Sequence, residues 1–173
     1  MNILLHICCA PCAVSCVDSL RAQGHTVEGF WYNPNIHPYD EYTSRLGALQ
    51  CFSAETSLKI HYIDVYGFDE FTKAVAGRID TRCEYCYAVR FAEAAAYAAE
   101  NGFDAFTTTL LISPYQNHEL ITECCRRAAE KFGVEFYYAD FRPLFREGQR
   151  RAKEMGLYRQ KWCGCVYSIN DGK

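Results

Sequence analysis

The chain has 173 residues, half of them hydrophobic, and a formal net charge of −3 at neutral pH. This length suits one domain with a substantial core, so we expect residues 1–173 to form a single α/β domain. No stretch approaches the roughly 20 apolar residues of a membrane span, and the amino terminus has no basic region and an apolar run too short for a signal peptide. We therefore expect a cytoplasmic protein with no membrane partner.

Short apolar runs alternate with helical patterns along the chain. Strands are expected at 3–7, 26–31, 59–65, 105–109 and 134–139, and helices at about 13–23, 39–56, 86–100, 120–132 and 144–156. This alternation predicts an open, mostly parallel Rossmann-like sheet of about five strands with helices on both faces. Ligands collect at the carboxyl ends of such strands, so a site is expected where 3–7 and 105–109 end.

Cysteine is the most informative residue type, with eleven copies. Most lie in four clusters: Cys8-Cys9-Ala-Pro-Cys12, Cys83-Glu-Tyr-Cys86, Cys124-Cys125 and Cys163-Gly-Cys165. In the reducing cytoplasm, clustered cysteines indicate metal binding or catalysis more often than structural disulfides, and an odd number excludes complete pairing. Thiolates gathered by folding would bind a soft metal or an iron–sulfur cluster, or exchange disulfides.

The first two clusters together supply the four thiolates that a cubane cluster needs. Cys8 and Cys9 lie where a strand gives way to a helix, and backbone N–H groups there favour thiolates. Cys83 and Cys86 form a Cys-x-x-Cys expected just before a long helix, a spacing that lets both sulfurs reach one metal or cluster. Cys12 could join either this set or the next.

The pair Cys163 and Cys165 could clip a metal or form an easily reduced disulfide. Six or seven candidate thiolates exceed what one structural zinc site uses. The remaining cysteines are expected to be structural, at positions Cys16, Cys51, Cys124 and Cys125, and we expect His6 and His118 to be satisfied in the core.

Charge is unevenly distributed along the chain. Residues 1–141 carry a balance of −8, whereas residues 142–161 carry +5 and lead directly into Cys163. The single domain is therefore expected to contain a basic helix and the Cys-Gly-Cys segment at 142–165. Its candidate RNA contacts are Arg142, Arg150, Arg151 and Arg159, because arginine forks bind phosphate. A solvated helix face is the alternative interpretation.

Several motifs occur together in a fixed order. They are Leu5-His-Ile-Cys-Cys-Ala-Pro-Cys12, Tyr32-Asn-Pro-Asn-Ile-His-Pro38, Arg82-Cys-x-x-Cys86, Thr107-Thr-Thr-Leu110 with Ser113-Pro114, Asp140-Phe-Arg142 and Tyr158-Arg-Gln-x-x-Cys-Gly-Cys165. Each is weak alone, but in this order they resemble the cobalamin-independent (QueH-type) epoxyqueuosine reductases across nearly the whole chain. That family is similar in fold to nucleotide α-hydrolase-like Rossmann domains.

The resemblance implies an oxidoreductase of tRNA processing that completes queuosine biosynthesis. Its reaction is the two-electron removal of the epoxide oxygen from epoxyqueuosine at the wobble position of tRNA, with electrons from an unidentified donor. It also implies that Cys8, Cys9, Cys83 and Cys86 hold a 4Fe-4S cluster. Cys163 and Cys165 then act as catalytic residues, either at a second metal, such as iron, or as a redox-active disulfide, and Cys12 is a further ligand of that metal.

Two other classes of protein remain open from the sequence. A thiol–disulfide oxidoreductase would use Cys163 and Cys165 and would need no iron. A zinc-stabilised RNA-binding module would bind tRNA without catalysing a reaction.

Overall fold

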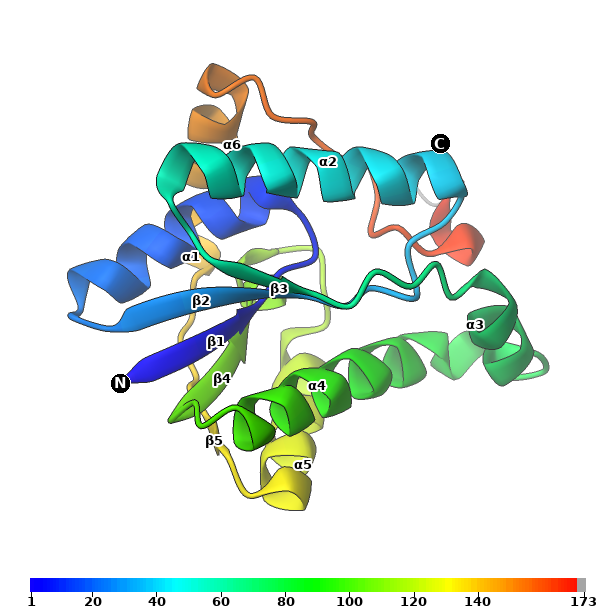
Figure 1. Cartoon of the computed structure of the whole chain (residues 1–173). Coiled ribbons are helices and arrows are strands. Elements are labelled where there is room, and N and C mark those ends of the chain that lie inside the picture. The colour runs from blue at the N-terminus through cyan, green and yellow to red at the C-terminus, as the bar shows by residue number, and fades with distance from the viewer. Residues whose placement is uncertain (171–173) are drawn as a thin grey trace.

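The computed structural model describes residues 1–170, which form a five-stranded sheet flanked by helices (Figure 1). The strands are β1 (Asn2–His6), β2 (Thr26–Trp31), β3 (Ile60–Tyr62), β4 (Ala105–Thr108) and β5 (Glu135–Phe136). They lie in the order β3-β2-β1-β4-β5, and every neighbouring pair is parallel. The predicted open, Rossmann-like parallel sheet of about five strands is confirmed.

Helices cover both faces of the sheet, as predicted. They are α1 (Ala10–Ala22), α2 (Tyr39–Thr56), α3 (Phe68–Val75), α4 (Arg82–Glu100), α5 (His118–Phe132) and α6 (Phe145–Glu154). Short 3₁₀ turns cover η1 (Ile79–Thr81), η2 (Thr109–Ile112), η3 (Arg142–Leu144) and η4 (Val166–Ser168). Figure 1 shows α1, α2 and α6 on one face, and α4 and α5 packed together on the other.

The core is centred on β1, the middle strand. Ile3, Leu4 and Leu5 have no exposed surface, so this strand is buried on both faces. Such burial explains why these three residues form an apolar run instead of an alternating pattern. The large side chains of Phe30 and Trp31 on β2 are equally buried beside it.

Both edge strands are shorter than the sequence suggests. The predicted strand 59–65 contracts to Ile60–Tyr62, and 134–139 contracts to Glu135–Phe136. Among the described residues, β3 pairs with β2 alone and β5 with β4 alone. Each edge strand therefore ends where its hydrogen bonding to that single neighbour ends. The apolar pattern continues further because side chains beyond the strands still pack on the core, as at Ile63 and Tyr137.

Three local expectations are wrong. The helix expected from residue 86 begins at Arg82, so Cys83 and Cys86 lie inside its first turns and not before them. Helix α3 was not expected at all, although its Phe71 and Val75 are buried. Cys51 is exposed on the outer side of α2 and is not a core residue.

Most of the other structural residues behave as predicted, but His118 does not lie in the core: it is only half-buried, and its Nε2 contacts the hydroxyl of Tyr138 at the surface. Cys16, Cys124 and Cys125 are buried. His6 is also buried and bonds through its ring to Thr108 and to the carbonyl of Tyr32. Within residues 1–170, no helix combines the length and apolar character needed to cross a membrane.

The strand order reverses between β1 and β4, which creates a switch point at their carboxyl ends. Cys8 follows β1, and Thr109 follows β4. The backbone N–H of Cys8 donates to Thr109 Oγ1 across this point, over 3.3 Å. The first cysteine cluster therefore lies at the ligand-binding position of an open parallel sheet, as the sequence predicts.

Candidate functional site: a cysteine-lined cavity

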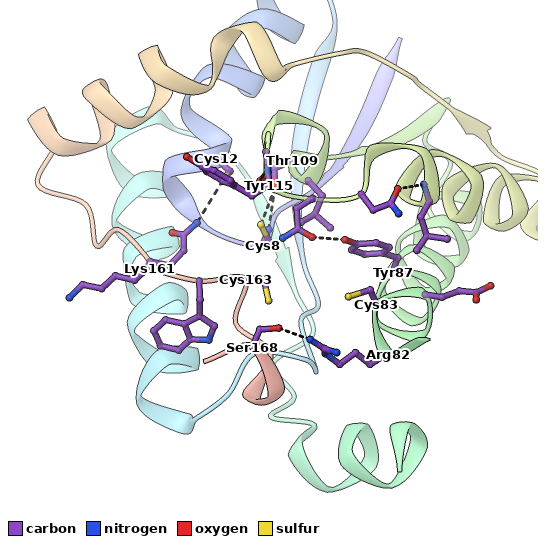
Figure 2. A pocket seen from close by; sticks show the side chains of 18 of the residues that line it. Cys8, Cys12, Arg82, Cys83, Tyr87, Thr109, Tyr115, Lys161, Cys163 and Ser168 are labelled. Carbon is purple, nitrogen blue, oxygen red and sulfur yellow. Dashed lines mark hydrogen bonds between the residues drawn. The ribbon is translucent and has the colours of Figure 1, made fainter. Parts of the chain in front are cut away.

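A cavity of about 830 Å³ opens at the switch point. Its lining includes Cys8 from the end of β1, Cys83 from α4 and Cys163 from the carboxy-terminal segment. Figure 2 shows the sulfur atoms of these three residues directed toward a common space. Folding therefore brings together cysteines that are up to 155 positions apart in the sequence.

The first sulfur group is Cys8, Cys9 and Cys12. Their sulfur atoms all lie within 4.8 Å of one another, and the Sγ atoms of Cys8 and Cys9 are 3.8 Å apart. A tetrahedral ion with metal–sulfur bonds of about 2.3 Å holds its sulfurs roughly 3.8 Å apart. In the part of the chain that the structure describes, no other group of three histidine, cysteine or acidic ligands is this compact. The group therefore fits a single soft metal ion.

The second sulfur group consists of Cys83, Cys86, Cys163 and Cys165. Cys86 and Cys165 are both buried in a small apolar cluster that also includes residues of α3. Cys83 and Cys163 are exposed to the cavity. All eleven cysteines are free thiols. These four thiols lie outside the compact first group. The structure therefore separates the seven predicted site cysteines into a set of three and a set of four.

Hydrogen bonds to sulfur organise the first group. Gln160 donates from Nε2 to Cys9 Sγ at 2.8 Å and lies 3.8 Å from Cys12 Sγ. Thr109 Oγ1 lies 3.6 Å from Cys8 Sγ. Hydrogen bonding with the side chains of Cys12 and Cys9 holds the pKa of Cys8 well below its ordinary value, although burial opposes this shift. Cys8 is therefore the member of the group most ready to bind a cation as a thiolate.

The environment of the second group is different. Burial raises the pKa of the Cys86 thiol to about 12, against the opposing charge of Arg90. Without a bound cation, Cys86 therefore keeps its proton. Arg90 also acts on the buried His6: burial, and then the charge of this arginine, lower the pKa of His6 to about 4, so this histidine is neutral at physiological pH.

A buried arginine on α2 holds the carboxy-terminal cysteine pair in place. Arg45, only 1% exposed, donates to the carbonyl oxygens of Trp162 at 2.9 Å and Cys163 at 3.1 Å. It pairs with Glu41, whose carboxylate lies 2.6 Å away and also accepts from the hydroxyl of Tyr158. We call Arg45, Glu41 and Tyr158 the arginine clamp. The clamp fixes the backbone from which Cys163 reaches the cavity.

Gly164 is required by this arrangement. Its φ of +107° lies in the region that favours glycine. A Cβ there would lie 3.2 Å from the guanidinium nitrogens of Arg45 and 3.1 Å from Ile36. Its carbonyl accepts from the backbone N–H of His37 at 2.8 Å. The middle residue of Cys-Gly-Cys therefore serves close packing against α2 and the preceding loop.

One wall of the cavity is aromatic and amide-rich. Tyr115 is 83% exposed, and its ring contacts Phe145 edge-to-face at 5.8 Å. Tyr87 donates to the side chain of Gln116 at 2.5 Å. Gln149 also lines this side. Such neutral donors, acceptors and rings suit a nucleobase, which offers π faces and hydrogen-bonding edges.

None of the predicted RNA-binding arginines is among the residues that line the cavity, and local acids pair with most of them. Arg142 pairs with Asp140 at 2.7 Å, Arg151 with Asp18, and Arg150 with Glu147 and Glu154, both at 2.5 Å. Arg159 donates to the neutral side chain of Gln149. The basic helix is therefore less electropositive than its sequence suggests.

Sequence reasoning missed the roles of Arg45, Glu41 and Arg90. Glu41 and Arg45 stand at the i, i+4 spacing of a helical ion pair, a signal that the sequence does carry. Such pairs are usually exposed, however, so their burial against a segment 118 residues away has no local signature. Arg90 sits in an alanine-rich helix whose pattern shows only a buried face.

Comparisons with known proteins agree with this geometry. The sequence profile of the family described as Epoxyqueuosine reductase QueH matches residues 3–171. A protein of that name from Dehalococcoides mccartyi is 40% identical over 167 residues, which are 96% of this chain and 92% of that protein. Another from Thermotoga maritima is 37% identical over 178 residues, covering 97% and 90% of the two chains. A third, from Acinetobacter baylyi, is 37% identical over 180 residues, covering 98% and 81%.

Proposed function

This chain belongs to the family of epoxyqueuosine reductase QueH, and from that premise we propose that it reduces epoxyqueuosine to queuosine in tRNA with an iron–sulfur cluster held in the cysteine-lined cavity. The net reaction consumes two electrons and two protons, converts the epoxide to an alkene and releases its oxygen as water. The observation that carries the proposal is the convergence of Cys8, Cys83 and Cys163 on one cavity at the switch point.

The residues present fit such a group. Seven thiols surround or adjoin the cavity, and thiolate is the donor that iron–sulfur clusters use. The volume of about 830 Å³ also lies in the range of sites that enclose small molecules, about 300–1,000 Å³. The chemistry supplied by a cluster with an adjacent iron, when bound, is single-electron delivery and polarisation of the epoxide oxygen.

We assign Cys8, Cys9, Cys83 and Cys86 to the 4Fe-4S cluster, as the resemblance implies. Cys12, Cys163 and Cys165 are assigned to the second iron. The sulfur distances support testing a different division, in which the first sulfur group binds one ion and the second sulfur group binds the cluster. Replacing Cys12 by serine is the reference change, because in either division it removes the single ion and leaves the cluster absorption. Replacing Cys9 by serine distinguishes the two divisions, because it removes the cluster in the first and the single ion in the second.

The aromatic and amide wall would receive the modified base. We propose that Tyr115 stacks on the base and that Gln116 and Gln149 bond to its edge. A wobble base in an anticodon loop is single-stranded and is able to enter such a pocket without opening a duplex. Enclosure by this wall would orient the epoxide toward the sulfur groups and exclude water.

The tRNA backbone would contact Arg142, Arg150, Arg151 and Arg159. Exposed ion pairs contribute only about 0–1 kcal/mol, so phosphates are able to replace the acids that now pair with these arginines. Replacing both Arg150 and Arg151 by glutamine should reduce the slope of log affinity against log salt by roughly 1.4, at about 0.7 per single-strand contact. Arg126→Gln, an exposed change on α5, is the control. An unchanged slope in the double variant would exclude α6 as the tRNA contact.

The assignment of the cluster is tested by Cys83→Ser, with Cys51→Ser as the matched control. Both cysteines are exposed, but only Cys83 lines the cavity. We expect anaerobically prepared Cys83→Ser to lose the visible absorption of the cluster and the turnover of epoxyqueuosine tRNA, while Cys51→Ser retains both. Full activity in a colourless protein would instead favour a thiol–disulfide oxidoreductase. Stoichiometric zinc with tRNA binding but no turnover would favour an RNA-binding module.

A further inference from the structure

Arg90 lies behind the second sulfur group, in the third turn of α4. Its side chain is only 2% exposed. Nε donates to the carbonyl of Cys86 at 3.0 Å, and Nη2 lies 3.2 Å from the Sγ of the same residue. The guanidinium carbon is 5.8 Å from the ring centroid of Tyr87 and 6.0 Å from that of Phe91. Arg90 is thus packed against two aromatic rings with its fork directed at a sulfur atom.

The charge of Arg90 has no carboxylate partner. Over residues 1–170, no aspartate or glutamate comes within ion-pair distance of it, whereas the other buried arginine, Arg45, pairs with Glu41 at 2.6 Å. Burying a cation without an anion costs several kcal/mol, and two aromatic rings offset only part of this cost. The balancing negative charge must therefore come from the sulfur side, where Cys86 Sγ is the nearest acceptor.

We propose that Arg90 is the buried counter-charge of the iron–sulfur cluster and that it tunes how readily the cluster accepts an electron. This inference rests on the proposed function. A cluster held by thiolates is anionic, and each added electron increases its negative charge. A fixed cation and a hydrogen bond to a ligand sulfur both favour the reduced form and so raise the reduction potential.

Arginine suits this role better than lysine. Its Nε bond to the carbonyl one helical turn earlier fixes the planar group, which leaves Nη2 aimed at the sulfur. A lysine ammonium carries the same charge but lacks the rigid fork that makes both contacts at once. Arg90 touches a ligand and neither the substrate nor the reacting atoms, so it is a positioning residue.

The test is a spectroelectrochemical titration of the loaded protein. In Arg90→Met, which removes the charge and the hydrogen bond, we expect a more negative midpoint potential at unchanged iron and sulfide content. Arg90→Lys should show a smaller shift in the same direction. Arg126→Met, which removes an exposed arginine of α5, is the control and should leave the potential unchanged. A fully loaded Arg90→Met with the wild-type potential would overturn the inference.

A second measurement does not depend on the folding of the methionine variant. Wild-type protein labelled with ¹⁵N-arginine, reduced to its paramagnetic state, should show a ¹⁵N coupling by pulsed EPR that disappears in Arg90→Lys. Absence of that coupling in the wild type would also overturn the inference. A wild-type protein that assembles no iron–sulfur centre would refute the proposed function itself, so the two failures are distinguishable.

Discussion

The arginine clamp offers a sharp test, because one side chain joins α2 to the carboxy-terminal cysteine pair. Arg45→Met removes two charge-assisted hydrogen bonds, to the carbonyls of Trp162 and Cys163, and leaves the carboxylate of Glu41 buried beside Tyr158 without its cation. Breaking a buried ion pair on one side costs about 3–5 kcal/mol. We expect a loss of that size in the unfolding free energy of the metal-free protein, measured by urea denaturation.

The double variant Arg45→Met with Glu41→Gln separates pairing from packing. It leaves no buried charge, so its loss should be smaller than the sum of the two single losses by about 0.5–3 kcal/mol. A local readout comes from alkylation followed by peptide mapping. Cys165, now 5% exposed, should become reactive in Arg45→Met, while Cys16 in the core stays protected. Arg45→Met with unfolding free energy within about 1 kcal/mol of wild type, and with Cys165 still protected, would refute the clamp.

Three further changes test other parts of the structure. Gly164→Ala places a Cβ at a positive φ and should cost at least about 1–2 kcal/mol of unfolding free energy, with lowered iron content after reconstitution; wild-type values for both would contradict the packing argument. Thr109→Val removes the acceptor of the Cys8 N–H and should cost about 1–3 kcal/mol in urea unfolding, whereas no loss would show that this bond is dispensable. Burial alone would raise the pKa of Glu28, but hydrogen bonds from His61 and a neighbouring lysine outweigh it and leave the pKa below its ordinary value. A carboxyl group whose pKa is lowered by folding stabilises the folded state above its unfolded pKa of about 4.3, and this stabilisation is lost as the pH falls through the folded pKa. Glu28→Gln should therefore be less stable than wild type at pH 7 and equal to it at low pH. A stability difference independent of pH would contradict this.

The sequence predicts those features of the fold that leave a local pattern. The apolar pattern of residues 3–7, interrupted by His6, indicates a strand buried on both faces, and cysteines directly after it place a site at the sheet's carboxyl edge. The edge strands β3 and β5 are overestimated because side chains that pack on the core continue the apolar pattern after the backbone pairing has ended. Hydrophobicity reports burial and not hydrogen bonding.

The candidate site is less predictable in its supporting residues than in its cysteines. Clusters of cysteines can be recognised directly in the sequence, and the resemblance to a known family implies a role for each cluster. The contacts of Arg45 with Cys163 and of Gln160 with Cys9 span 118 and 151 residues, so only the fold brings these partners together. Arg90 is similarly hidden, since a buried cation in a helix looks like a solvated one until its surroundings are known.

The central claim is that sulfurs from three distant segments hold one inorganic centre. The most direct measurement is the iron and acid-labile sulfide content of the protein, purified and reconstituted without oxygen. We expect about four sulfides per chain, with at least as many irons, as a 4Fe-4S cluster requires. A protein that folds normally but binds neither iron nor sulfide would contradict the claim.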